Sequence, residues 1–309
     1  MRKKENPVSA SDFANAMSDK KATMVKAKVA FFSLTSCEGC QFVLLDLGEK
    51  IFDFLRKVEL IDFSLIEEIP FPKLKKNSHG RVRPSSRTLR VHYGAGISRG
   101  QMPSERFSHA IDVSFVEGLP IKKEEIELLK KIREESKILV AMGNCAALGG
   151  IPEMKNYQGK EKTIRFIYKK LNHILNPEIK EIDNFVKVDF VIPGCPIDGE
   201  EFLKFVKDLI KGKIPEILQK PVCSECPNQG KENCFLRKKE PCLGPITLAG
   251  CQAICPKNNF LCYGCRGILK GINPKGFLEN LKKFKKPGEI EDNLEIFGIK
   301  DDLEKLKAL

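Results

Sequence analysis

Short apolar runs alternate with amphipathic stretches over the first two thirds of the chain. Short stretches rich in apolar residues predict β-strands at 28–34, 58–66, 111–117, 137–142 and 188–192. Apolar residues at helical spacing predict helices at 42–55, 121–134 and 163–175. Asp198 and Glu201 fit a capping box for one more helix. This alternation predicts an α/β fold with a doubly wound, mainly parallel sheet.

The pattern changes near residue 215. Residues 221–267 contain eight cysteines and five prolines with little regular periodicity. Such a segment buries little apolar surface, so we expect its order to come from metal ligation. Residues 276–284 and 303–309 are expected to form short surface helices. Residues 1–25 are polar and predict a flexible extension.

Charge adds a second feature. The chain has a formal net charge of +12. Residues 70–110 hold nine Lys or Arg residues and one acid, Glu105, which gives +8 of that total. A solvated basic loop and a docking surface for an acidic partner both remain open. Nucleic acid is not expected as a partner, because the segment has few aromatic residues and no recognisable nucleic-acid-binding module.

Targeting signals are absent from the N-terminal sequence. It has no apolar core of a signal peptide and no twin-arginine pair. No apolar run approaches the length of a membrane span. We therefore expect a cytoplasmic protein without a membrane span.

Twelve cysteines are the strongest chemical signal in the chain. Four of them follow the predicted strands at their C-terminal ends, where open α/β sheets build their sites. Stretches more than 150 residues apart can therefore converge on one metal cluster. These four are Cys37, Cys40, Cys145 and Cys195.

The other eight cysteines are close together in the sequence. They are Cys223, Cys226, Cys234, Cys242, Cys251, Cys255, Cys262 and Cys265. Twelve makes three sets of four, and four thiolates are what one [4Fe–4S] cluster requires.

Two alternatives to iron–sulfur clusters stay open. Disulfides would need an oxidising compartment, and structural zinc would usually pair two C-x-x-C knuckles within a short loop.

Several motifs, in order, resemble those of one family. They are T-S-C-E-G-C-Q, F-V-E-G, G-x-C-A-x-x-G-G, P-G-C-P and the run from P-V-C-S-E-C to C-Y-G-C-R-G. This series resembles the small, electron-transfer subunit of [NiFe] hydrogenases, above all the cytoplasmic sulfhydrogenase and F420-non-reducing types. The resemblance covers about residues 26–272. The N-terminal part is also similar to the cluster-bearing 20 kDa subunit of respiratory complex I, which carries one cluster.

The resemblance implies three [4Fe–4S] clusters as cofactors. It implies a proximal group of ligands, a distal group and a medial group, and these names are used below. The proximal group is Cys37, Cys40, Cys145 and Cys195; the distal group is Cys223, Cys226, Cys234 and Cys242; the medial group is Cys251, Cys255, Cys262 and Cys265.

The resemblance also implies a division of the chain. A flavodoxin-like domain over 26–215 would hold the proximal cluster and include the basic insertion 70–110. A two-cluster domain over 216–272 and a C-terminal helical tail over 273–309 would follow.

The function implied is that of an oxidoreductase subunit acting on hydrogen. The nickel–iron active site would lie on a large partner subunit, and no catalytic residue is expected in this chain. A second partner would be an electron-acceptor subunit containing flavin or iron–sulfur clusters. Glu117 is a candidate for handling protons or orienting ligands beside the proximal cluster, although a strand-end carboxylate facing solvent fits as well. A subunit of a complex I-like assembly that handles no hydrogen remains the alternative.

Overall fold

The computed structural model describes residues 26–65, 111–157 and 178–306. The expected extension 1–25, the basic segment 70–110 and the expected helix 163–175 lie outside these ranges. Within them, no helix has both the length and the apolar character needed to cross a membrane.

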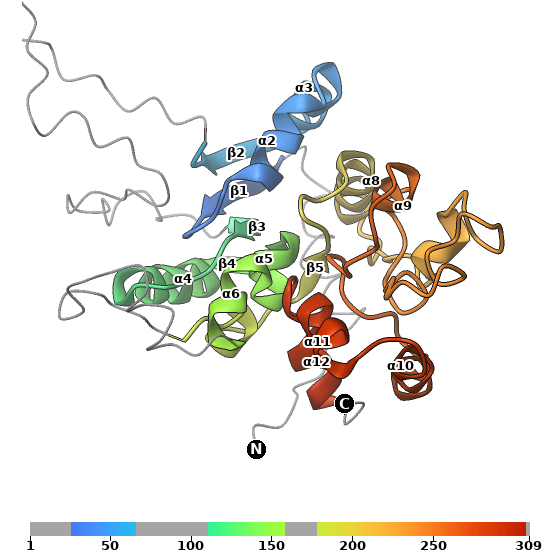
Figure 1. The fold of residues 1–309 in the computed structure, drawn as a ribbon. Coiled ribbons are helices and arrows are strands. Elements are labelled where there is room, and N and C mark those ends of the chain that lie inside the picture. Colours follow the sequence, from blue (N-terminus) through green and yellow to red (C-terminus); the bar gives the residue numbers. More distant parts are fainter. Residues whose placement is uncertain (1–25, 66–110, 158–177, 307–309) are drawn as a thin grey trace, which may run out of the picture.

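Five parallel strands form the central sheet, in the order β2-β1-β3-β4-β5 (Figure 1). This order is that of flavodoxin-like folds. The sequence predicted every strand, although β5 is shorter than expected. The strands are β1 (Ala27–Ser33), β2 (Val58–Phe63), β3 (Ile111–Glu117), β4 (Ser136–Met142) and β5 (Phe190–Ile192).

Helices and 3-10 turns connect and cover the strands. They are α2 (Gly39–Asp46), α3 (Glu49–Leu55), α4 (Lys123–Glu135), α5 (Gly143–Leu148), α6 (Gly150–Tyr157), η1 (Ile182–Asn184), α8 (Gly199–Ile210), η2 (Val222–Glu225), α9 (Ile254–Lys257), α10 (Pro274–Lys282), α11 (Pro287–Glu295) and α12 (Ile299–Lys305).

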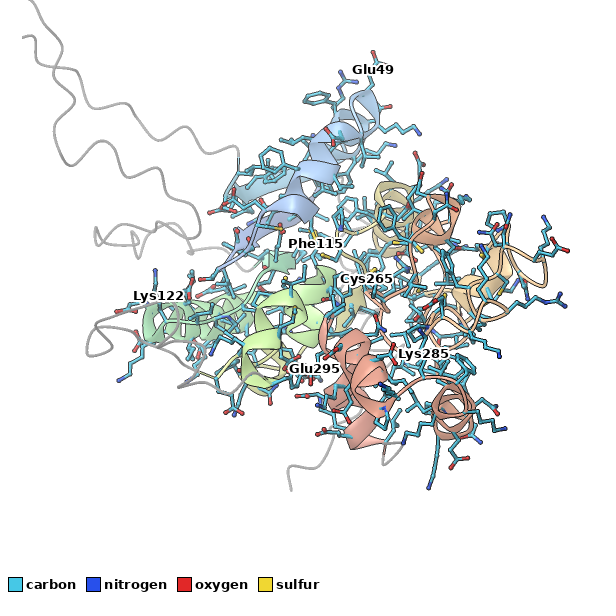
Figure 2. The ribbon with its side chains drawn as sticks, viewed as in Figure 1. Glu49, Phe115, Lys122, Cys265, Lys285 and Glu295 are labelled. Carbon is cyan, nitrogen blue, oxygen red and sulfur yellow. The ribbon has the colours of Figure 1, made fainter. Side chains whose placement is uncertain are left out.

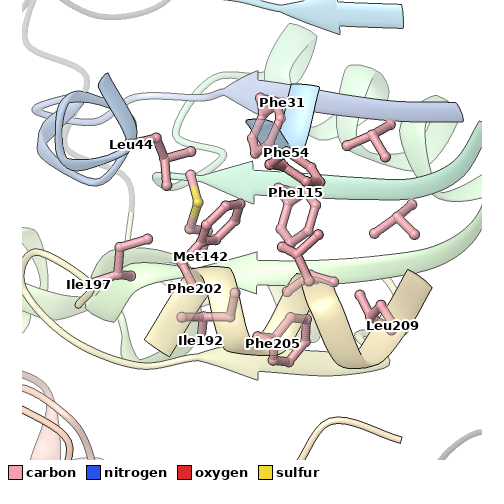
Figure 3. Packing of buried hydrophobic residues seen from close by; sticks show 14 of the residues in the cluster. Phe31, Leu44, Phe54, Phe115, Met142, Ile192, Ile197, Phe202, Phe205 and Leu209 are labelled. Carbon is pink, nitrogen blue, oxygen red and sulfur yellow. The ribbon is translucent and has the colours of Figure 1, made fainter. Parts of the chain in front are cut away.

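A hydrophobic core lies on each face of the sheet. Aromatic rings dominate the face covered by α2, α3 and α8, where Phe31 stacks on Phe115 with ring centroids 4.9 Å apart (Figure 3). Phe202 of α8 packs against both rings. The opposite face packs against α4 and η1. The inner strands β1, β3 and β4 are largely buried, and their high content of apolar residues is why they could be predicted.

The single helix predicted over 42–55 is wrong. Gly48 adopts a positive φ of 57° and separates α2 from α3. Phe42 of α2 and Phe52 of α3 were counted on the apolar face of that helix, but 51% and 58% of their surface is exposed. The capping box predicted for α8 is only half formed. The Asp198 carboxylate accepts a hydrogen bond from the Glu201 amide at 2.8 Å, but the Glu201 carboxylate binds Arg266 instead.

Short C-terminal helices are present as expected, α10 and α12, but each buries one face. In Figure 1, α11 and α12 (red) lie beside α6, and α10 lies next to them. Their leucines and isoleucines form a core of their own with Leu243 and Ile246 of the cysteine-rich segment. This core therefore joins the C-terminal helices to the segment that carries the last eight cysteines.

Candidate metal centres

The proximal group gathers at the C-terminal edge of the sheet. Chain segments that leave β1, β4 and β5 deliver Cys37, Cys145 and Cys195, and Cys40 lies in the first turn of α2. Burial raises the pKa of the Cys145 thiol to about 12, and the nearby Cys195 and Cys37 thiols add to the rise. Burial also raises the pKa of Cys40, whose neighbours include Cys195 and Cys145. The structure therefore brings these four sulfurs together.

The backbone around this group leaves room close to the sulfurs. Glu38, between the first two cysteines, adopts a left-handed φ of 61°, which costs energy for a residue with a side chain. Gly143 has a φ of 87°, and a Cβ there would lie 2.4 Å from the Cys40 Sγ. Such crowding at positive φ permits only glycine.

Glu117 ends β3 directly behind the proximal group. Its side chain is 2% exposed, so the solvent-facing alternative is wrong. Its two carboxylate oxygens accept hydrogen bonds from the backbone N–H groups of Cys40 and Gln41, each at 3.1 Å. Burial raises the pKa of Glu117, and these two bonds oppose the rise. Glu117 thus anchors the turn that presents Cys40.

The distal group lies in the irregular segment that begins at η2. Burial raises the pKa of the Cys223 thiol to about 12, helped by the nearby Cys242, Cys226 and Cys234 thiols. Gly244 faces this group, since a Cβ there would lie 3.2 Å from the Cys223 Sγ and 3.6 Å from the Cys242 Sγ.

The medial group lies between the other two. Burial raises the pKa of Cys265 to about 12, with Cys251 and Cys255 among the neighbours that raise it. The residues after Cys251, Gln252 and Ala253, both adopt positive φ, at 54° and 52°. As at Glu38, a strained backbone wraps around the thiols.

Two sulfur contacts connect the groups in series. The backbone N–H of Cys195 lies close enough to the Cys265 thiol to lower its pKa, so the proximal and medial groups are neighbours. The backbone N–H of Cys262 donates to the Cys242 Sγ at 3.4 Å, which joins the medial and distal groups. Figure 2 labels Cys265 in the interior, where the α/β part meets the cysteine-rich part.

The twelve cysteine sulfurs are suitable ligands for metal ions or metal clusters. All twelve cysteines are free, which counts against disulfides. Within the described ranges, no three His, Cys, Asp or Glu side chains are placed to hold one metal ion together. Iron–sulfur clusters are held by cysteine thiolates, four to a [4Fe–4S] cluster, and the three groups each offer four.

The sequence did not single out two residues of this region, Asn144 and Arg266. Both are 2% exposed and each is next to a cysteine. Their polar side chains beside ligand cysteines were the only available signal. Their partners come from distant segments, which the sequence could not identify.

A family model covers more than half of the chain. The model for the NADH ubiquinone oxidoreductase 20 kDa subunit matches residues 37–209, which include the whole proximal group. The other eight cysteines lie beyond the matched region.

Curated relatives extend the match past that region. Sulfhydrogenase 2 subunit delta of Pyrococcus furiosus is 32% identical, over 88% of this chain and 99% of its own length. A subunit of the F420-non-reducing hydrogenase vhu of Methanocaldococcus jannaschii is 31% identical, over 78% of this chain and 81% of its own length. Among solved structures, the [NiFeSe] hydrogenase of Desulfovibrio vulgaris Hildenborough aligns at 18% identity with a TM-score of 0.47, over 78% of this chain and 93% of that one. The chain therefore belongs to the NADH ubiquinone oxidoreductase 20 kDa subunit family, as an iron–sulfur subunit of the hydrogenase type.

Proposed function

We propose that this chain is the electron-transfer subunit of a [NiFe] hydrogenase. It would relay electrons through three [4Fe–4S] clusters between a nickel–iron site on a large partner subunit and a flavin- or iron–sulfur-containing partner. The cysteine groups defined above would hold the clusters. The α/β domain over 26–215 would carry the proximal cluster, and residues 216–272 the other two.

The observation that carries this proposal is the series of sulfur contacts. Cys195 lies beside Cys265, and the Cys262 N–H contacts the Cys242 Sγ, so the three thiol groups follow one another through the folded chain. A chain with one isolated cluster would need neither contact. A cytoplasmic location agrees with twelve free thiols, since reducing compartments keep cysteines reduced.

The residues of this chain would hold, shield and tune the clusters. A [4Fe–4S] cluster supplies the ability to take up and release single electrons. All the thiols except that of Cys37 are at least partly buried, which limits their contact with water, and the backbone N–H of Cys262 donates to the Cys242 Sγ. Hydrogen bonds to cluster sulfur are among the features that set reduction potentials. Glu117 would keep the Cys40 turn in place.

The proposal is tested by producing this chain anaerobically, alone and together with its large partner subunit. Alone, the chain should contain about twelve iron and twelve sulfide, on the rule of four per cluster, and show no hydrogen uptake. The assembled complex should reduce viologen with hydrogen. About four iron per chain, or a fully loaded complex inactive toward hydrogen, would instead favour the complex I-like alternative.

A further inference from the structure

Arg266 is a buried positive charge that the proposed relay does not yet use. It directly follows Cys265 of the medial group, and its side chain is 1% exposed. It is among the largest side chains that are fully buried in the described residues. Burying a guanidinium is costly unless all its donors are satisfied, so its position calls for a specific role.

Three segments bind the planar guanidinium. Its Nη1 donates to the Pro193 carbonyl oxygen at 2.9 Å, and its Nε donates to the Ala249 carbonyl oxygen at 2.9 Å. Its Nη2 lies 2.7 Å from both carboxylate oxygens of Glu201 in α8. Pro193 precedes Cys195 by two residues, and Ala249 precedes Cys251 by two. The side chain therefore ties a proximal loop to a medial loop.

The surrounding backbone keeps a space for this group. Gly250 has a φ of 115°, and a Cβ there would lie 2.5 Å from the Arg266 Nη2. The Gly250 amide is in turn held by the Glu225 carboxylate, at 2.9 and 3.0 Å from its two oxygens. Glu225 lies between Cys223 and Cys226 of the distal group. The contacts of Arg266 thus continue toward the third group.

Asn144 makes a second connection at the same junction. Its Nδ2 donates to the Cys265 carbonyl oxygen at 3.0 Å and to the Phe297 carbonyl oxygen at 3.2 Å. Its own backbone N–H donates to the Gly194 carbonyl oxygen at 2.7 Å. The proximal and medial loops are therefore fixed to each other by two buried side chains, of which only Arg266 carries a charge.

We propose that Arg266 is a positioning residue for electron transfer between the proximal and medial clusters. Its rigid fork fixes the separation of the two ligand loops, and its charge stabilises added negative charge on either cluster. Transfer rates fall steeply with distance, and a nearby cation raises a reduction potential, so both properties act on this step. The inference rests on the proposed function.

Three variants in the assembled complex separate the effect of the guanidinium's planar hydrogen-bonding geometry, the fork, from the effect of its charge. Arg266→Gln removes both, Arg266→Lys keeps the charge without the fork, and Glu201→Gln removes the neutralising carboxylate. Arg133→Gln is the matched control. Arg133 also binds a carboxylate, that of Asp189 at 2.6 Å, together with backbone carbonyls, but none of its contacts involves a cysteine loop.

The readouts are iron content, potentiometric EPR titration, and the rate at which the medial signal follows the proximal one after mixing with hydrogen. Arg266→Gln should shift both potentials downward, and Glu201→Gln should shift them upward. Arg266→Lys should keep the potentials but slow the proximal-to-medial step on the order of tenfold, as for other residues that orient metal ligands. The control should match the unaltered complex.

Two outcomes would overturn the proposal. One is loaded Arg266 variants with unchanged potentials and rates. The other is Glu201→Gln without an upward shift, which decides the case even if the Arg266 variants fail to load. If the clusters load as three but no hydrogen reaction occurs, the proposed function fails separately, because chemical reductants still allow the titration.

Discussion

At the scale of single residues, the cysteines depend on neighbours that have no side chain. Gly143 directly follows β4 and lies two residues before Cys145. It is so close to the Cys40 sulfur that no Cβ would fit between them. Gly244 faces the distal group less tightly, since a Cβ there would lie 3.2 Å from the Cys223 Sγ. The backbone conformation therefore sets the space beside each sulfur. A metal cluster has a fixed shape, so it fits only if that space has the matching size.

We predict that Gly143→Ala removes the proximal cluster selectively. The new Cβ would lie 2.4 Å from the Cys40 Sγ, so that sulfur or the β4–α5 turn must move. Iron should fall from about twelve to about eight per chain, on the four-per-cluster rule, with loss of one EPR signal after reduction.

Gly48→Ala is the control for backbone strain. Gly48 also has a positive φ, of 57°, yet a Cβ there would meet nothing within 4 Å. Both variants place a side chain at a positive φ, a strain of about 1–3 kcal/mol, but only Gly143→Ala adds the clash. Full iron content in Gly143→Ala, or equal iron loss in both variants, would show that the space near Cys40 is not needed.

At the scale of elements, the sequence predicted what depends on local pattern. Each strand is a short stretch rich in apolar residues, so all five were found. The break at Gly48 was missed because apolar spacing continues across it. The core of α10, α11 and α12 was missed because its partners, Leu243 and Ile246, lie in a segment without periodicity. Only the folded chain shows that these short helices cover the cysteine-rich segment.

We predict that this C-terminal core stabilises the two-cluster segment. Leu294 of α11 is fully buried in it, so Leu294→Ala should cost about 2–5 kcal/mol, as for buried leucines elsewhere. Amide hydrogen exchange on the loaded chain should rise in α10–α12 and around Leu243. Leu306→Ala serves as the control, because Leu306 is 59% exposed. Faster exchange confined to the helices would mean that the core does not support the cysteine-rich segment.

At the scale of the whole molecule, the chain brings distant cysteines into one series. The proximal group could be predicted from the residues alone, because strand ends share one edge of the sheet. The division of the other eight cysteines came only through the resemblance, since spacing alone permits other sets. The contacts between groups, and the distant partners of Arg266 and Asn144, depend on how the two parts pack, which no local pattern in the sequence indicates.

A series arrangement makes a strict prediction about the middle member. Cys251 is the medial residue to change, because Cys262 and Cys265 also contact the neighbouring groups. Cys251→Ser should remove or convert the medial cluster while the proximal and distal clusters stay loaded. Under hydrogen, the complex should then reduce the proximal cluster at its usual rate and the distal cluster far more slowly, because the only short path is interrupted. Dithionite, which reaches each cluster from solution, should still reduce both.

If the distal EPR signal appears under hydrogen as fast as in the unaltered complex, electrons reach that cluster by another path and the series order is wrong.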